Sequence, residues 1–226
     1  DYYPIAELVA QQDKVTDEEI AALVKEYDQL YEVADNAKEG GKDRKQVIEA
    51  ARVEIALRRF LALKGAKAFT TNFDDLHGVD QLPGLACQRL MAEGFGFGAE
   101  GDWKTAALCR TMWFMGQGLE GGCSFMEDYT YHFDGKDSAI LQAHMLEVCP
   151  LISEHKPKLE VHPLGIGGKN DPARLVFTTK EGTGVAATVV DMGNRFRLIV
   201  NQVDCIKSHK LPKLPVASAL WIPQPS

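Results

Sequence analysis

The chain has 226 residues, 45% of them hydrophobic and 25% charged, a composition typical of a globular protein with one large or two modest domains. Its net charge of -7 argues against nucleic acid and anionic membranes as partners, because both bind basic surfaces. The five cysteines include no CxxC pair, which argues against a zinc ribbon or disulfide framework and favours a reducing cytoplasm. No apolar run approaches the ~20 residues of a membrane span.

The N-terminal part of the chain has the periodicity of helices. Thr16 and Glu19 form a capping box, which predicts a helix over 16–35. A second helix is expected over 43–64, with Gly65 at its C-terminal end. The side chains expected to face inward on this second helix are Ile48, Ala51, Ile55 and Phe60.

An α/β alternation follows these two helices. Residues 66–73 have the composition of a buried strand. A further helix is expected over 85–93, with Gly94 ending it. The next helix is expected from Asp102 to about Met115, and Asp102 suits the positive N-terminus of that helix.

Strands predominate beyond the glycine-rich residues 116–122. Short strands at regular spacing predict an antiparallel sheet. We therefore expect an α/β protein with a helix-rich α/β central domain at 1–120 and a mainly antiparallel β domain at 121–226. The chain begins without Met and stops just after a strand-like run, so we expect it to be incomplete at both ends. The expected strands lie within 123–133, 139–148, 158–166, 173–179, 184–192 and 196–206.

Gly96–Gly101 matches the GxGxxG pattern of dinucleotide-binding loops. The match is weak, because a helix rather than a strand is predicted before it. Glu100 and Asp102 would also repel phosphate groups. We expect the glycines instead to let the backbone turn and present Glu100.

Three ionisable side chains, Glu100, Glu127 and His144, lie among glycines, aromatics and apolar residues. Burying an unpaired carboxylate there would be costly. Two carboxylates and an imidazole can offset that cost by sharing a divalent cation. The three residues therefore predict most of a metal site. Glu147 is a spare ligand candidate, but strand alternation places it on the opposite face from His144.

Each of these residues also has a simpler interpretation. Glu100 could cap a helix, although Asp102 already suits that role. Glu127 could form a buried ion pair with an arginine, and His144 could be a hydrogen-bonded core residue. Alternation along a strand favours a pocket around Glu127. It places that acid on one face with Phe125, Tyr129 and Tyr131.

Several long segments of the chain resemble L-arabinose isomerases, and together they run through most of residues 66–221. Residues 1–65 resemble the same family with weaker signatures. The segments are FDDLHGVDQLPGLACQRLMAEGFGFGAEGDWKTAAL, GGCSFMEDYTYHF, AHMLEVCP, HPLGIGGKNDPARLVF, GNRFRLIVN and LPKLPVASALW.

The resemblance implies isomerisation of L-arabinose to L-ribulose, and of D-galactose to D-tagatose, in a cytoplasmic hexamer. It implies a divalent cation, Mn²⁺ or another such as Co²⁺ or Mg²⁺, with Glu100, Glu127 and His144 as ligands. The chain corresponds to the family's central domain and part of its C-terminal domain. It lacks the family's N-terminal α/β domain and the GGAHHT-like segment that supplies a further histidine ligand.

The implied reaction moves one hydrogen between C1 and C2 and one proton between O1 and O2 of the open-chain sugar. The hydrogen could travel as a hydride. Alternatively, Glu100 and Glu127 could act as an acid/base pair through a cis-enediol. Phe73 and Tyr129 are candidates for the apolar pocket wall, and Asp102 for supporting the ligands. Two other functions stay open: a metal-dependent sugar hydrolase or lyase with the same ligands, and a catalytically inactive fragment of the isomerase.

Overall fold

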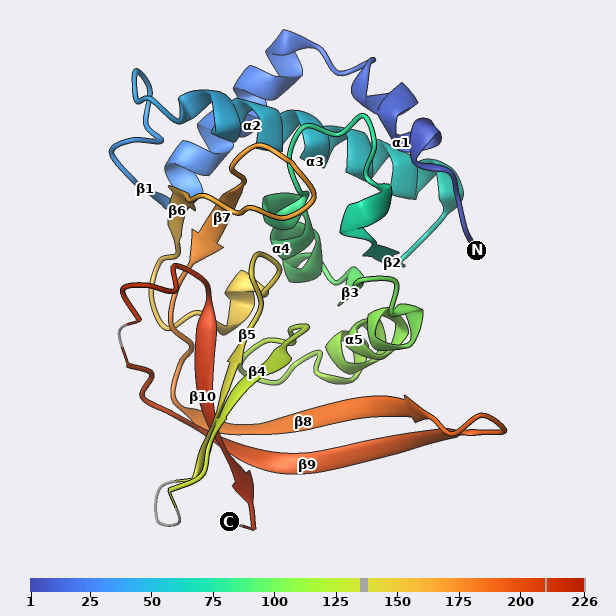
Figure 1. Ribbon diagram of the computed structural model, residues 1–226, viewed down its shortest axis with the longest axis vertical. Coiled ribbons are helices and arrows are strands. Elements are labelled where there is room, and N and C mark those ends of the chain that lie inside the picture. The colour runs from blue at the N-terminus through green and yellow to red at the C-terminus, as the bar shows by residue number, and fades with distance from the viewer. Residues whose placement is uncertain (135–137, 210, 226) are drawn as a thin grey trace.

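The computed structural model describes residues 1–134, 138–209 and 211–225. Figure 1 shows a helical layer at the top, a middle part around α4 and α5, and a five-stranded sheet below. The predicted fold class is confirmed, since a helical α/β part is followed by a mainly antiparallel sheet. No helix in the described ranges is long and apolar enough to cross a membrane.

The helical layer consists of α1 (Ile5–Gln12), α2 (Asp17–Leu30) and α3 (Arg44–Lys64). The predicted capping box is present: Thr16 accepts from the amide of Glu19, and Glu19 accepts from the amide of Thr16. The helix predicted over 16–35 ends earlier, at Leu30, because β1 (Glu32–Val33) pairs with a distant strand.

The second predicted helix is confirmed as α3. Gly65 takes the left-handed conformation after it, with φ 63°. The prediction that Ile48 faces inward is wrong, since the residue is 39% exposed. The buried stripe of α3 instead includes Val47 and the acid Glu54.

The middle part contains β2 (Ala68–Thr71), α4 (Gly84–Ala92), β3 (Gly96–Ala99) and α5 (Trp103–Met115). The predicted strand is present as β2, but it is half-buried rather than buried. β3 was not predicted. It pairs in parallel with β2, from Ala68 opposite Gly96 to Thr71 opposite Ala99. A short 3₁₀ helix, Phe73–Asp75, follows β2.

Gly96 and Gly98 have a different role from the predicted one, because they lie within β3 rather than in a turn. A Cβ on Gly96 would lie 2.0 Å from the carbonyl oxygen of Ala106, and one on Gly98 would lie 2.4 Å from that of Asp102. Real Cβ atoms cannot approach so closely. These glycines therefore allow α5 to pack directly against β3.

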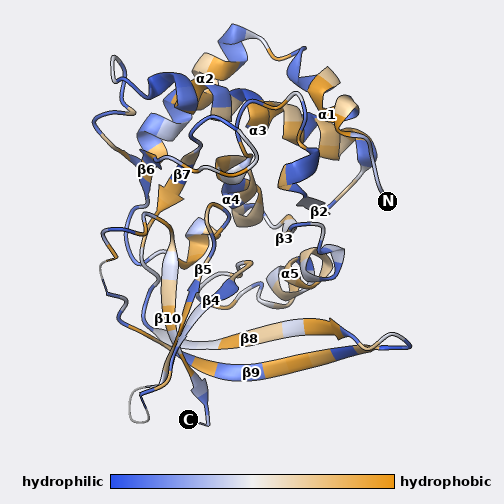
Figure 2. Cartoon of the chain, viewed as in Figure 1, coloured by the Kyte–Doolittle hydropathy of each residue, from blue (hydrophilic) through white to orange (hydrophobic). Residues whose placement is uncertain are grey.

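The large sheet has the order β4-β5-β10-β9-β8, and every neighbouring pair in it is antiparallel. The β8–β9 hairpin projects from the molecule in Figure 1 and carries the hydrophobic stretches coloured orange in Figure 2. Several of its apolar side chains are about half exposed, among them Val185, Phe196, Leu198, Ile199 and Val200. The strands are β4 (Glu127–His132), β5 (Ala139–Ala143), β8 (Gly182–Asp191), β9 (Phe196–Ile206) and β10 (Ser218–Gln224).

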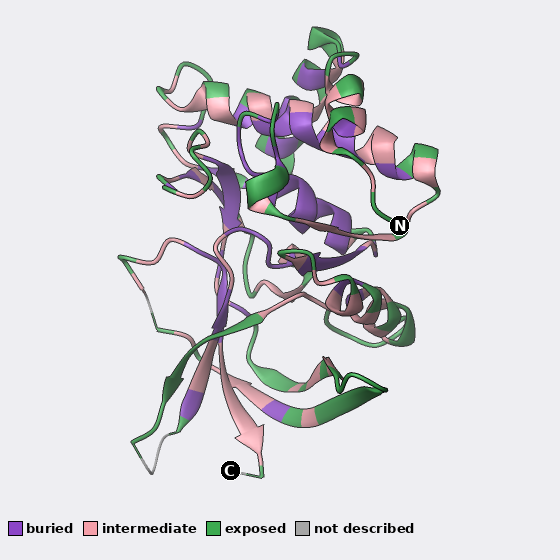
Figure 3. Ribbon diagram, turned by 45° about the vertical axis from the view of Figure 1, so that its right-hand side comes forward, coloured by how far each residue is buried: buried purple, intermediate pink, exposed green. Residues whose placement is uncertain are grey.

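A smaller sheet joins the two halves of the chain. β6 (Lys158–Val161) pairs in parallel with β1 and antiparallel with β7 (Ala173–Val176). One hydrophobic core runs from α1–α4 into this sheet, and Figure 3 shows the buried residues concentrated there. The domain division near residue 121 stays a prediction.

Candidate functional site

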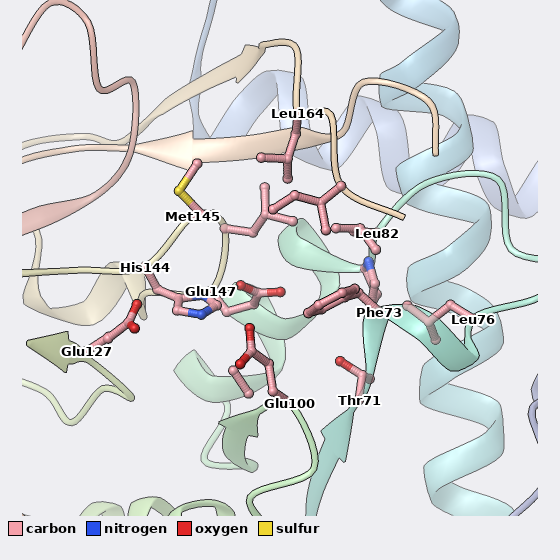
Figure 4. Close-up of a pocket in the computed structure, with 14 residues that line it drawn as sticks. Thr71, Phe73, Leu76, Leu82, Glu100, Glu127, His144, Met145, Glu147 and Leu164 are labelled. Atoms are coloured by element: carbon pink, nitrogen blue, oxygen red, sulfur yellow. Dashed lines mark hydrogen bonds and ion pairs between the residues drawn. The ribbon is translucent and has the colours of Figure 1, made fainter. Parts of the chain in front are cut away.

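A pocket of about 110 Å³ lies between the middle part and the large sheet. Its walls come from segments far apart in the sequence. Figure 4 shows acidic and imidazole groups on one side and apolar side chains on the other. The lining residues are Thr71, Phe73, Leu76, Leu82, Pro83, Ala99, Glu100, Glu127, His144, Met145, Leu146, Glu147, Leu164 and Ile166.

Glu100 enters the pocket from a tight turn after β3. Its φ is 59°, in the left-handed region that non-glycine residues rarely adopt, and Gly101 follows with φ 86°. The turn is held to β2, because the amide of Gly101 donates to the hydroxyl of Thr70 over 2.8 Å and to the carbonyl of Thr71 over 3.2 Å. This strained backbone directs the Glu100 side chain to the pocket.

Glu127 and His144 are brought together by strand pairing. Glu127 begins β4 and lies opposite Ala143, the last residue of β5, so His144 follows directly. His144 was expected within the strand over 139–148, but it lies one residue beyond the end of β5. The burial argument, however, is wrong for the acids, because Glu100 and Glu127 are exposed residues. Only His144 and Glu147 are largely buried, with side chains 13% and 8% exposed.

The prediction that Glu147 faces away from His144 is wrong. The chain bends at Met145 and Leu146, which breaks the strand alternation. As a result, Oε2 of Glu147 lies 2.6 Å from Nδ1 of His144. Burial lowers the pKa of His144, but the hydrogen bond to Glu147 and the charges of three carboxylates outweigh it, so the pKa is raised. Those carboxylates belong to Glu147, Glu127 and Glu100.

Two predicted wall residues differ in position. Phe73 lines the pocket, whereas Tyr129 is not among the lining residues. A bulge between Asp128 and Thr130 shifts the register of β4 and breaks the predicted alternation. The hydroxyl of Tyr129 contacts Sδ of Met145 at 3.5 Å. The hydroxyl of Tyr131 donates to the carboxylate of Asp128 over 2.7 Å.

Asp102 caps α5 and so fixes the turn that carries Glu100. Its carboxylate accepts from the amides of Lys104 and Thr105 at 3.0 and 3.1 Å and from the hydroxyl of Thr105 at 2.7 Å. Burial raises the pKa of Asp102, but the hydrogen bonds from Thr105 and the nearby ammonium group of Lys104 outweigh it and lower the pKa.

Leu164 and Ile166 complete the apolar wall but were not predicted as pocket residues. The strand expected over 158–166 ends at Val161, and both residues lie in the loop between β6 and β7. Their contribution depends on the pairing of β6 with β1 and β7, which brings this loop across the molecule.

The pocket has the donor types that hard divalent cations prefer, namely carboxylate oxygens from Glu100, Glu127 and Glu147 and an imidazole nitrogen from His144. Among residues 1–134, 138–209 and 211–225, no three His, Cys, Asp or Glu side chains converge closely enough to hold an ion. The chemistry of the donor set therefore fits a cation, while the side chains would have to draw closer to bind one.

Comparison with known proteins covers nearly the whole chain. Residues 1–118 match the family model of the L-arabinose isomerase central domain, and residues 122–226 match that of the L-arabinose isomerase C-terminal domain. The L-arabinose isomerases of Phocaeicola vulgatus and Bacteroides thetaiotaomicron are 61% and 59% identical to it over 100% of this chain. That of Clostridium beijerinckii is 56% identical. The chain spans about half the length of these relatives, 46% in the first two. The chain belongs to the L-arabinose isomerase family.

Proposed function

We propose that this chain supplies most of the catalytic centre of an aldose–ketose isomerase that interconverts L-arabinose and L-ribulose. One observation carries the proposal: Glu100, Glu127 and His144 line a single pocket opposite an apolar wall that includes Phe73. Relatives that are 61%, 59% and 56% identical bear the name L-arabinose isomerase. We extend the proposal to D-galactose and D-tagatose, which undergo the same change at C1 and C2.

Glu100 and Glu127 are proposed as the groups that move protons between the sugar oxygens and, on an enediol route, between C2 and C1. Both are exposed residues at the pocket, so each can reach a bound substrate. The apolar side chains opposite would pack on the C–H faces of the sugar and exclude water from it. If a hydride moves instead, the two carboxylates act only on the oxygens.

Glu100, Glu127 and His144 are proposed to hold a divalent cation, with Mn²⁺ as the first candidate and Co²⁺ or Mg²⁺ as others. Such a cation supplies positive charge that stabilises developing alkoxide and orients the two oxygens of the sugar. The three pocket carboxylates support this proposal. Among the described residues that line the pocket, His144 is the only basic side chain beside these carboxylates.

We further propose a cytoplasmic homohexamer. The half-exposed apolar side chains of β8 and β9 support association, since contiguous apolar surface is uncommon on monomers. Five free cysteines support a reducing compartment. The net charge of -7 supports a neutral sugar as the ligand rather than nucleic acid or an anionic membrane.

A chimera tests the function directly. Residues 1–226 replace the matching segment of the Phocaeicola vulgatus L-arabinose isomerase, which is 61% identical. We expect the chimera to form L-ribulose with Mn²⁺ and to lose activity after dialysis against a chelator. Glu100→Gln or Glu127→Gln should lower kcat by about 10²–10⁴-fold. Glu120→Gln, an exposed acid outside the pocket, is the matched control. An assembled chimera without turnover, or a Glu127→Gln variant at wild-type kcat, would refute the proposal.

A second candidate is that the isolated chain is a folded but inactive piece of such an enzyme. It is favoured by the chain spanning only about half of its relatives. Assay of residues 1–226 alone with Mn²⁺ decides this, because measurable ketose formation refutes inactivity. With sugar deuterated at C2, deuterium retained in the chimera's product would exclude a freely exchanging enediol.

A further inference from the structure

His144 is held on two sides. Its ring packs edge-on against Phe125, with centroids 5.0 Å apart and planes at 72°. Its Nδ1 lies 2.6 Å from Oε2 of Glu147, and Figure 4 shows the ring between the carboxylates of Glu127 and Glu147. Only 13% of the His144 side chain is exposed, so the ring has little freedom to turn.

Glu147 is an acid in a buried position, with 8% of its side chain exposed. A buried carboxylate is costly unless a positive charge or hydrogen bonds offset it. The neighbouring cation is Arg174, which is almost fully buried. Burial holds the pKa of Arg174 at about 10 although the charge of Glu147 raises it, so the guanidinium stays charged at neutral pH.

Arg174 also forms hydrogen bonds with the backbone of two segments near the pocket. Its guanidinium donates to the carbonyl of Met145 over 3.2 Å and to that of His162 over 2.9 Å. The first bond holds the bend that returns Glu147 to His144. The second holds the loop that continues to Leu164 and Ile166 in the pocket wall. One buried arginine therefore supports both the acid and the pocket.

An ionised carboxylate can only accept hydrogen bonds. Glu147 therefore requires a proton on Nδ1 of His144, and in the neutral imidazole the lone pair then lies on Nε2. Which nitrogen carries the proton decides which nitrogen can bind a cation, and metal-binding histidines commonly donate their other N–H to a carboxylate.

We propose that Glu147 is a positioning residue: it fixes the Nδ1–H tautomer of His144 and so presents Nε2 as the nitrogen that binds the divalent cation. This inference rests on the proposed function for the cation, but the tautomer itself can be measured without metal or sugar. The same chain provides a matched control in the pair His162 and Glu160, where Nε2 of His162 lies 2.6 Å from Oε2 of Glu160 and neither residue lines the pocket.

The tautomer is read from the imidazole ¹⁵N shifts of residues 1–226, without metal and at a pH where histidine is neutral. We expect His144 to be protonated at Nδ1 in the wild type and to lose that preference in Glu147→Leu. Glu147→Gln retains an acceptor oxygen and should keep the preference in part. Glu160→Leu should change only the His162 signals. A wild-type His144 protonated at Nε2 would overturn the proposal even if the chimera isomerises arabinose.

The consequence for the cation is measured as Mn²⁺ affinity of the chimera by electron paramagnetic resonance. Glu147→Leu should weaken Mn²⁺ binding by about 10–100-fold. The Mn²⁺ affinity of Glu147→Gln should lie between those of Glu147→Leu and the wild type. This variant provides the test if Glu147→Leu does not fold. Glu160→Leu should leave the affinity unchanged. Unchanged affinity in Glu147→Leu would overturn the proposal. So would a loss in Glu147→Gln as complete as in Glu127→Gln with the tautomer intact, because Glu147 would then be a ligand itself.

Discussion

Gln88 and Leu175 exchange hydrogen bonds in both directions: the Leu175 amide donates to Oε1 of Gln88 over 2.7 Å, and Nε2 of Gln88 donates to the Leu175 carbonyl over 3.0 Å. The same Nε2 also donates to the carbonyl of Val148 over 3.0 Å. Gln88 is fully buried on α4, so its side-chain amide links α4 to β7.

Gln88→Leu should therefore destabilise the chain by at least about 2 kcal/mol, because each buried backbone group left without a partner costs about 1–3 kcal/mol. Urea denaturation measures the loss. The control is Gln117→Leu, at an exposed glutamine after α5, which should change stability by less than about 0.5 kcal/mol. Equal stability of the two variants would contradict this role of Gln88.

Glu54 is a second polar centre of the core, and we expect its removal to be more costly still. It is fully buried and accepts from the hydroxyl of Tyr27 over 2.7 Å, and from Arg58 and Arg89 over 2.9 Å each. Glu54→Ala leaves the charge of Arg89 buried without this partner, which should cost about 3–5 kcal/mol in a denaturation experiment.

The control for Glu54 is an ion pair nearer the surface. Arg44 binds Asp28 through two hydrogen bonds of 2.8 and 2.6 Å, and 39% of the Asp28 side chain is exposed. Asp28→Ala should cost less than about 1 kcal/mol. A loss in Asp28→Ala as large as in Glu54→Ala would show that burial is not the deciding factor.

Two substitutions of Glu100 distinguish the effect of its left-handed backbone on stability from the effect of its carboxylate on activity. Glu100→Gly and Glu100→Ala both remove the carboxylate, but only glycine relieves the strain at φ 59°. The glycine variant should be more stable than the alanine variant by about 1 kcal/mol, as measured by urea denaturation. Both variants of the chimera should lose isomerase activity. An alanine variant as stable as the glycine variant would mean that the turn is not strained.

Phe73 and Tyr129 should differ in their effect on substrate binding. Phe73→Ala in the chimera removes part of the pocket wall and should raise KM about tenfold, equivalent to about 1.4 kcal/mol. Tyr129→Phe removes only a hydroxyl that contacts the sulfur of Met145, so its kcat and KM should both match the wild type. Steady-state kinetics on L-arabinose distinguishes the two variants. A large increase in KM in Tyr129→Phe would show that Tyr129 contributes to the pocket.

Cation binding should be visible in the stability of the chimera. At a Mn²⁺ concentration 100 times Kd, binding to the folded state alone should add about 2.7 kcal/mol. A chelator should reverse the gain, and Glu127→Gln should reduce it strongly, whereas Glu120→Gln should keep it. Thermal denaturation with and without Mn²⁺ measures the shift, and an equal shift in Glu127→Gln would exclude that acid as a ligand.

Local rules were enough to predict much of the first half of the fold. The capping box of Thr16 and Glu19 and the left-handed Gly65 act over a single helical turn, so the sequence shows them directly. The proximity of Glu127 and His144 also follows from pairing of consecutive strands. In each case the interacting groups are close in sequence or lie at paired, consecutive strands.

Irregular strand geometry and contacts between distant segments were missed. The bulge at Asp128–Thr130 moved Tyr129 off the pocket, and the bend at Met145 and Leu146 brought Glu147 to His144. Alternation assumes a regular strand and fails at both places. A buried acid such as Glu54 could not be distinguished from a solvated one, because its partner Arg89 lies on another helix.

The pairing of β1 with β6 also governs how the chain can be made. Residues 32 and 33 leave the ribosome well before residues 158 and 159, with which they pair. Until then, the apolar faces of α2 and α3 lack the sheet that completes their core. Nascent chains that stop before β6 should therefore remain partly folded and aggregation-prone, and chaperones that bind apolar surface should protect this stage of synthesis.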